Sequence, residues 1–168
     1  MKTITRSVLA VLALAGACGA LAQEYPSRPM RLVIPFAPGG TTDTLGRVFA
    51  QVFQDKLGQP VIVDNRPGAG SQIGTDSVAK AAPDGYTMLL GPADGLAILP
   101  ALKRKLPYDP LKDFTPVSLI AHSPMVFAVN AKFPPKTLGE LVEYAKAKPG
   151  DIRFGSAGIG SILQLTVE

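Results

Sequence analysis

Apolar residues in the first half of the chain follow two patterns: short continuous runs, and longer stretches with apolar positions every three or four residues. The runs Met30–Phe36, Pro60–Val63 and Thr87–Leu90 predict strands that are covered on both faces of a sheet. The periodic stretch from Thr41 to Leu57 predicts an amphipathic helix, which Gly58 ends.

A second helix, rich in small residues, is predicted from Gln72 to Ala82, so that strands and helices alternate in this part of the chain. Consecutive strand–turn–helix units predict an α/β fold with a parallel sheet and right-handed crossovers. Each predicted strand is followed by a turn of small residues, and ligands of such sheets bind outside the carboxyl ends of the strands. We therefore expect the turns to converge on one binding site.

The second half of the chain predicts further elements after a charged connection that prolines interrupt. Apolar runs at Val117–Ala121, Met125–Asn130 and Ile152–Phe154 are candidate strands. Thr137 and Glu140 have the spacing of a capping box and predict the start of a helix. A last helix follows a glycine-rich turn and reaches the final residue without a C-cap, so we expect that the chain is cut short there.

The turn Ala37–Gly40, between the first strand and the first helix, is a candidate anion site. Backbone N–H groups at a helix start have no partner within the helix and lie at the positive end of its dipole. The turn has no Lys, Arg, His or Cys, so amides, waters and shape would hold the anion, and we expect binding rather than catalysis. Asp43 could contact a ligand, although we favour a role as a cap or dipole partner.

The N-terminus predicts export. A basic start at Met1–Arg6, an apolar stretch at Ser7–Ala20 and small residues before Gln23 are typical of a secretory signal peptide over residues 1–22. The chain has 17 basic and 13 acidic residues, and cleavage removes Lys2 and Arg6, which leaves a net charge of +2. This modest charge, without a basic run, argues against nucleic acid as a partner.

The only cysteine, Cys18, lies inside the predicted signal peptide. Lipidation at Cys18 is an alternative to cleavage after Ala22, but the three residues before this cysteine lack the usual large aliphatic side chain. Cleavage leaves a mature chain without a thiol, and an exported protein without disulfides fits a bacterial periplasm.

Other kinds of site fit the sequence less well. None of the glycine-rich turns carries the lysine of a phosphate loop, and Gly68–Gly74 misses the dinucleotide pattern by one residue. A serine-hydrolase elbow fails because Phe154 stands two residues before Ser156, where a glycine is needed. His122 is the only histidine, and we read it as a polar turn residue. We therefore expect no catalytic residue, no metal site and no cofactor.

Two charged residues near the rim of the predicted binding site could either contact a ligand or have a role unrelated to binding. Arg66 could steer an anion or could be a solvated loop arginine. Asp94, on the turn after the third strand, would disfavour a second anion and favour an amine, amide or hydroxyl group of a ligand. The alternative for Asp94 is an exposed loop aspartate.

Five motifs occur in one order along the chain and cover nearly all of its mature part. They are Pro35-Phe36-Ala37-Pro38-Gly39-Gly40 with Asp43 and Arg47, Asn65-Arg66-Pro67-Gly68-Ala69-Gly70, Pro83-Asp84-Gly85-Tyr86, Leu106-Pro107-Tyr108-Asp109-Pro110 with Asp113-Phe114, and Gly155-Ser156-Ala157-Gly158-Ile159-Gly160-Ser161. In this order they resemble the substrate-binding receptors of tripartite tricarboxylate transporters, the Bug family of periplasmic solute-binding proteins.

The resemblance implies an α/β fold of the type II periplasmic-binding-protein kind, a two-domain flytrap that closes on a small carboxylate. Residues 23–124 would form the first domain, and residues 125–168 would begin the second. Such receptors are about twice as long as this chain, so the rest of the second domain and the return to the first would be missing. An isolated 23–168 fragment should then be aggregation-prone or poorly folded.

The resemblance also implies a ligand site in which the turn after the first strand cradles a carboxylate through backbone amides and bridging waters. The implied ligand-binding residues come from three turns of the first domain and one turn of the second. They are Phe36, Ala37, Pro38, Gly39, Gly40, Thr41, Thr42, Asp43, Gly68, Ala69, Gly70, Ser71, Ala93, Asp94, Ser156, Ala157, Gly158, Gly160 and Ser161.

The implied function is capture of a dicarboxylate or tricarboxylate, an acidic amino acid or an aromatic acid in the periplasm. A monomeric receptor would hand this acid to the membrane subunits of a transporter, without catalysis. A sensor with the same fold is the alternative, and an enzyme would need a nucleophile or base from outside these residues.

Three residues depart from the family pattern. Gln164 stands where a histidine is common and Leu99 where an asparagine is common, which puts the ligand contacts of the far side in doubt. Gly46 replaces an alanine in the first helix, at a cost of about 1 kcal/mol if the position is exposed.

Overall fold

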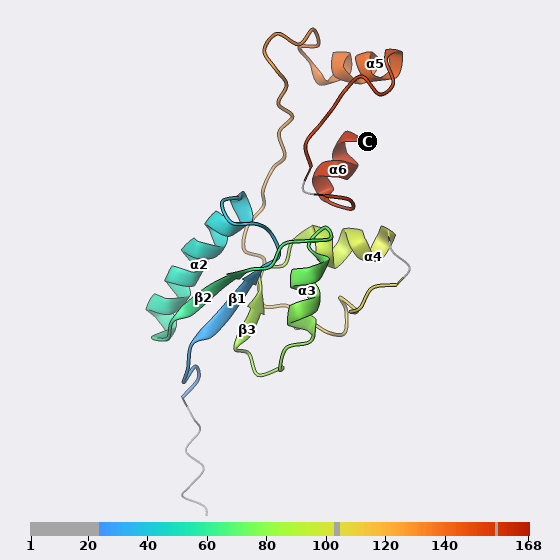
Figure 1. Cartoon of the computed structure of the whole chain (residues 1–168). Coiled ribbons are helices and arrows are strands. Elements are labelled where there is room, and N and C mark those ends of the chain that lie inside the picture. Colours follow the sequence, from blue (N-terminus) through green and yellow to red (C-terminus); the bar gives the residue numbers. More distant parts are fainter. Residues whose placement is uncertain (1–23, 103–104, 157) are drawn as a thin grey trace, which may run out of the picture.

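The computed structural model describes residues 24–102, 105–156 and 158–168. The predicted signal peptide, Cys18 and the candidate site residue Ala157 lie outside the described residues. We use "first lobe" for residues 24–124 and "second lobe" for residues 125–168, following the predicted boundary. Figure 1 shows the first lobe as a small sheet with helices beside it, and the second lobe at the end of a long extended connection.

The first lobe contains a parallel sheet of three strands. They are β1 (Met30–Ile34), β2 (Val61–Asn65) and β3 (Thr87–Leu89), in the order β2-β1-β3. Met30 pairs with Val61 and Arg31 with Thr87, so both neighbours run parallel to β1. The three predicted strands and the parallel sheet are confirmed.

In the described part of the first lobe, three helices follow the carboxyl ends of the strands, and a fourth continues directly from the third. They are α2 (Thr41–Leu57), α3 (Gln72–Ala79), the π-helix η1 (Asp94–Ile98) and α4 (Leu99–Leu102). α2 ends as predicted at Gly58, which has a left-handed φ of 68°.

The core of the first lobe lies where α2 packs on the sheet. Its buried residues are Met30, Leu32, Ile34, Ala50, Val61 and Leu90. The face of α2 that is buried consists of Asp43, Gly46 and Ala50, whereas Val48, an apolar residue of the periodic stretch 41–57, is 58% exposed. Small residues face the sheet because α2 approaches it closely, and the larger apolar residues lie beside or away from this contact.

Gly46 is buried in this contact rather than exposed. A Cβ atom at Gly46 would overlap the Cδ1 atom of Ile34 and lie 3.2 Å from Leu90. The expected cost of an exposed helical glycine therefore does not apply here, because the missing methyl group gives room to Ile34.

The second lobe contains two helices, α5 (Leu138–Ala147) and α6 (Ile162–Val167). The predicted capping box of α5 is confirmed, because Thr137 Oγ1 accepts a hydrogen bond of 3.2 Å from the Glu140 amide. The Glu140 carboxylate in turn accepts a bond of 2.7 Å from the Lys136 amide.

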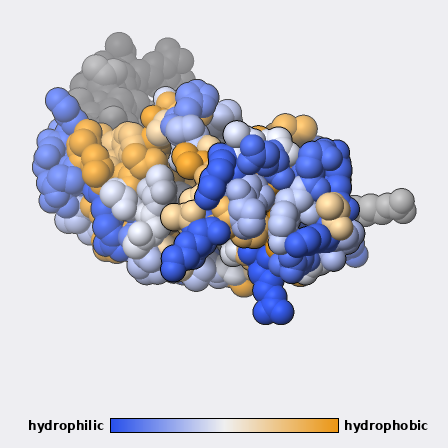
Figure 2. All heavy atoms as spheres, turned by 90° about the horizontal axis from the view of Figure 1, so that it is seen from above, coloured by the Kyte–Doolittle hydropathy of each residue, from blue (hydrophilic) through white to orange (hydrophobic). Residues whose placement is uncertain are grey.

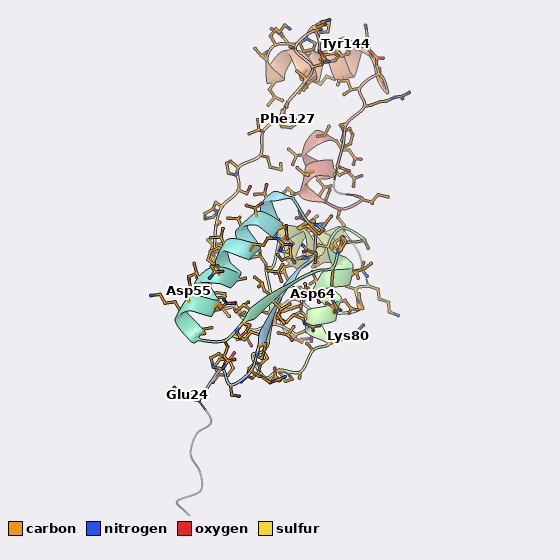
Figure 3. All side chains as sticks on the ribbon, turned by 60° about the vertical axis from the view of Figure 1, so that its left-hand side comes forward. Glu24, Asp55, Asp64, Lys80, Phe127 and Tyr144 are labelled. Atoms are coloured by element: carbon orange, nitrogen blue, oxygen red, sulfur yellow. The ribbon has the colours of Figure 1, made fainter. Side chains whose placement is uncertain are left out.

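The strands predicted at Val117–Ala121, Met125–Asn130 and Ile152–Phe154 are wrong for this structure. All three stretches lack strand structure, and within the described residues no strand pairs with them. A strand needs the backbone of a neighbouring strand as its hydrogen-bond partner, and an apolar run cannot supply one by itself. Phe127 lies on the extended connection to α5 (Figure 3).

Much of the apolar surface of the second lobe is exposed. Residues 125–130 and 151–155, with α5 and α6, line a groove of about 450 Å³. Val126 beside this groove is 86% exposed, and none of the residues of α5 is buried. On the face shown in Figure 2, hydrophobic side chains reach the surface between hydrophilic ones.

Candidate functional site

The predicted turns lie at one end of the sheet. Figure 1 shows the N-terminal ends of α2, α3 and η1 at the carboxyl edge of the strands, with the turn before α6 above α3 and η1. This arrangement follows from the parallel order of the strands, because each strand delivers its following turn to the same edge.

The turn after β1 is held by the carboxylate of Asp43, which is 4% exposed. Asp43 Oδ2 accepts hydrogen bonds from the Gly39 amide (2.9 Å) and Arg47 Nε (3.0 Å), and Oδ1 accepts one from Asn65 Nδ2 (2.9 Å). The hydrogen bond from Arg47, followed by those from Gly39 and Asn65, lowers the pKa of Asp43 to about 2. The favoured role of Asp43 at the helix start is confirmed, and a ligand contact stays a prediction.

Asn65 and Arg47 complete this network, although the sequence had given them no separate role. Asn65 Nδ2 also donates to the Phe36 carbonyl at 3.1 Å, and Arg47 Nη2 donates to Asn65 Oδ1 at 3.3 Å. The last residue of β2 thus ties the start of the turn to α2. The only sequence signal for this bracing role was that Asn65 and Arg47 both lie within the ordered motifs.

The turn leaves its other amides available. Residues 37–41 are exposed, and the amides of Thr41, Thr42 and Asp43 have no acceptor within α2 because they begin the helix. Gly39 has a φ of 90°, a conformation that favours glycine. This geometry can donate hydrogen bonds to a small anion at the positive end of the helix dipole.

The turn after β2 has an unusual backbone. Gly68, Ala69, Gly70 and Ser71 all have positive φ values, of 129°, 51°, 63° and 74°. Ser71 is only 1% exposed, and its hydroxyl group has no hydrogen-bond partner among the described residues. The turn thus places a buried polar group beside the start of α3.

The turn after β3 leads into η1, which packs tightly on α3. A Cβ atom at Gly95 would lie 2.5 Å from Thr75 Oγ1 and 2.7 Å from Ser71 Oγ, so there is no room for a side chain. The Tyr108 hydroxyl donates a hydrogen bond of 2.7 Å to the Gly95 carbonyl. Burial raises the pKa of this Tyr108 hydroxyl.

Asp94, the first residue of η1, is buried at 5% exposure, so the alternative of an exposed loop aspartate is wrong. Its Oδ1 accepts a hydrogen bond of 2.8 Å from the amide of Ile162, the first residue of α6. The second lobe covers Asp94 and supplies the N–H donor that sequence analysis had assigned to a ligand.

The turn before α6 meets the second and third turns directly. A Cβ atom at Gly70 would lie 2.8 Å from the Ile159 carbonyl oxygen, and one at Gly160 would lie 2.8 Å from Leu99 Cδ2. Ser161 is fully buried. Of the other predicted residues here, Ser156 and Gly158 are exposed, and within the described residues no hydrogen bond joins this turn to the turn after β1.

Gln164 and Leu99, on this side of the site, have internal partners. The Gly160 amide donates to Gln164 Oε1 at 2.7 Å, and Gln164 Nε2 donates to Glu168 at 2.8 Å. Leu99 is fully buried and packs on Gly160. Both side chains therefore stabilise the turn and α6.

The chemistry at this edge consists of backbone amides, hydroxyl groups and two carboxylates with internal partners. In the part of the chain that the structure describes, no group of three or more His, Cys, Asp or Glu side chains could hold a metal ion. Among the same residues, no helix has the length and apolar character needed to cross a membrane.

Comparison with known proteins identifies the family. Residues 45–168 match the model of the tripartite tricarboxylate transporter family receptor. The chain belongs to this family. Among the relatives of this receptor chain, BugT of Bordetella pertussis is 45% identical over 148 residues, which are 88% of this chain and 45% of BugT. The resemblance to the Bug family of periplasmic solute-binding proteins is confirmed.

Solved structures of receptors place the fold in the same group. The receptor chain is similar to MatC from Rhodopseudomonas palustris with bound malate, with 39% identity and a TM-score of 0.76 over 82% of this chain and 47% of MatC. It is also similar to R. palustris Rpa4515 with adipate, with 36% identity and a TM-score of 0.71 over 82% of this chain and 46% of that one. The receptor chain spans about half the length of the relatives it matches.

Proposed function

We propose that this chain is part of a periplasmic receptor that captures a small carboxylate and delivers it to the membrane subunits of a tripartite tricarboxylate transporter. The observation that carries the proposal is the turn after β1, whose amides are exposed while Asp43 and Asn65 hold its backbone from behind. Such a turn favours a carboxylate because its donors are already oriented. Malate and adipate, named with two similar structures, belong to this chemical class.

In the proposed site, the turn 38–42 cradles one carboxylate group of the ligand, and the backbone amides of Thr41 and Thr42 donate to it. The turns at 68–71 and 93–94 line the same wall, and the turn at 156–161 closes the far side. The receptor acts as a monomer in the periplasm and releases its ligand unchanged. The turn after β1 carries no Lys, Arg or His side chain. Its contact with the ligand carboxylate therefore depends on shape and on hydrogen bonds from the backbone.

Calorimetry on the full-length mature receptor that contains this chain tests the proposal. We expect malate, adipate, citrate, glutamate and benzoate to include at least one acid that binds, whereas the analogue of that acid with every carboxylate converted to an amide does not bind measurably. Absence of binding by all mono-, di- and tricarboxylates to a folded sample would overturn the proposed function.

A further inference from the structure

One hydrogen bond joins the two lobes at a buried position. Asp94 Oδ1 of the first lobe accepts it from the Ile162 amide of the second lobe at 2.8 Å. Asp94 is 5% exposed and the adjacent Ser161 is fully buried, so water competes little for this contact. A hydrogen bond to a charged acceptor in such surroundings is stronger than one between neutral groups.

The surroundings of Asp94 hold its side chain in place. Gly95, the next residue, is seated against Thr75 and Ser71 without room for a methyl group, and its carbonyl accepts the hydroxyl of Tyr108 at 2.7 Å. Asp94 therefore projects from a backbone that α3 and Tyr108 fix on two sides.

The Ile162 amide, which donates to Asp94, lies at the start of a helix, where a carboxylate stabilises unpaired N–H groups. Ile162 begins α6, and its amide has no acceptor within the helix. The negative charge of Asp94 also lies at the positive end of the helix dipole. The glycines on both sides of the junction, Gly70 and Gly160, allow the two lobes to approach closely.

The geometry points to Asp94 as a positioning residue that fixes the turn 158–162 to the first lobe. This inference rests on the proposed function, because that turn is the far wall of the proposed carboxylate site. The contact then favours the arrangement in which the far wall lies against the first lobe. A contact that favours this closed arrangement raises affinity, because less of the binding free energy is needed to bring the two lobes together.

Amide hydrogen exchange in the ligand-free full-length receptor that contains this chain tests the contact directly. We expect Asp94→Ala to speed exchange of the Ile162 amide by about tenfold or more, and Asp94→Asn, which keeps an oxygen acceptor, to stay within about threefold of the parent. Asp113→Ala is the matched control, because Asp113 accepts the Asp109 amide within the first lobe at 2.7 Å. An Ile162 amide that exchanges equally fast in the parent and in Asp94→Ala would overturn the inference.

A second variant removes the donor instead of the acceptor. Ile162→Pro deletes the amide at the first position of α6, where proline fits, and Ser161 before it has the extended backbone that proline requires (ψ 153°). We expect Asp94→Ala and Ile162→Pro each to weaken carboxylate binding by about tenfold, and the double variant to be no weaker than either one. Fully additive losses would overturn the inference.

The two proposals can fail separately. Failure of the parent chain to bind any carboxylate removes the proposed function, while the exchange rate of Ile162 still reports whether Asp94 holds the turn. Carboxylate binding with unchanged Ile162 exchange in Asp94→Ala keeps the proposed function and removes the role of Asp94.

Discussion

Gly46 on α2 lies directly against Ile34 on β1, with no room between them for a methyl group. Ile34 is fully buried, so it cannot move into solvent to make space. The close approach of helix and sheet also sets the position of the α2 N-terminus, which carries the proposed anion site. Gly46 is therefore matched in size to the residue that faces it.

We expect Gly46→Ala to destabilise the chain by about 1–2 kcal/mol, because overpacking outweighs the gain in helix propensity. Gly139→Ala is the matched control: Gly139 also lies in a helix, and its Cβ would meet only Thr137 Oγ1 at 4.0 Å. This control should stabilise the chain by about 0.5–1 kcal/mol. Denaturant unfolding of the full-length receptor that contains this chain measures both, and equal effects at the two glycines would contradict the packing argument.

Ile34→Val tests the same contact from the other side, because it removes the Cδ1 atom that the new methyl group would overlap. Ile34→Val alone should cost about 0.5–1.5 kcal/mol. In combination with Gly46→Ala the total loss should be smaller than the sum of the single losses. Additive losses would show that Ile34 is not the obstacle.

Thr41→Pro should weaken carboxylate binding by about tenfold or more, because it deletes one amide donor of the proposed site. Thr41 is the first residue of α2, and Gly40 before it has an extended backbone (φ −83°, ψ 173°), so proline fits without breaking the helix. Thr41→Ala, which keeps the amide, should bind within about threefold of the parent. Calorimetry with the acid that binds best measures both variants, and equal affinities would remove this amide from the site.

Stability should depend on the charge of Asp43 at low pH. The pKa of Asp43 is lowered to about 2 in the folded chain, against about 3.9 for an unfolded aspartate. The stabilisation is therefore fully present above pH of about 4 and is lost as the pH falls towards 2. The difference in unfolding free energy between the parent and Asp43→Asn should shrink over this range, and a constant difference would contradict the network around Asp43.

Arg47→Met offers a second test, because the hydrogen bond from Arg47 is the largest cause of the low pKa of Asp43. In this variant the Asp43 carboxyl should titrate at a higher pH, which NMR of the side-chain carboxyl measures. An unchanged titration midpoint would show that Gly39 and Asn65 suffice.

The exposed apolar side chains of the second lobe and of the connection that leads to it predict association of the isolated chain. Val126 and Val117 are 86% and 92% exposed, and the groove beside residues 125–130 is open. We expect residues 23–168 alone to aggregate or to unfold without a sharp transition, and Val117→Ser with Val126→Ser to reduce aggregation in light scattering. A sharp two-state melt of the monomer would contradict this prediction.

Features that depend on near neighbours in the chain could be read from the sequence. The strands of the first lobe, the start of α2 near Thr41, its end at Gly58 and the capping box of Thr137 all follow from local spacing and backbone chemistry. The parallel sheet followed as well, because alternating strands and helices leave few other arrangements. The ordered motifs identified the family because each motif is a short local stretch of the sequence.

Features that depend on a distant partner could not be read from the sequence. The sequence placed Asp94 at the rim of a site, but its burial and its bond to Ile162, 68 residues later, come from the meeting of the two lobes. The sequence predicts a cost to the helix at Gly46, whereas the structure places Ile34 against this glycine. The apolar runs 117–121, 125–130 and 152–154 predict strands, yet a strand exists only beside another one. Local patterns thus determined which segments form helices and turns. Packing and pairing between distant residues decided which side chains are buried and which partners they have.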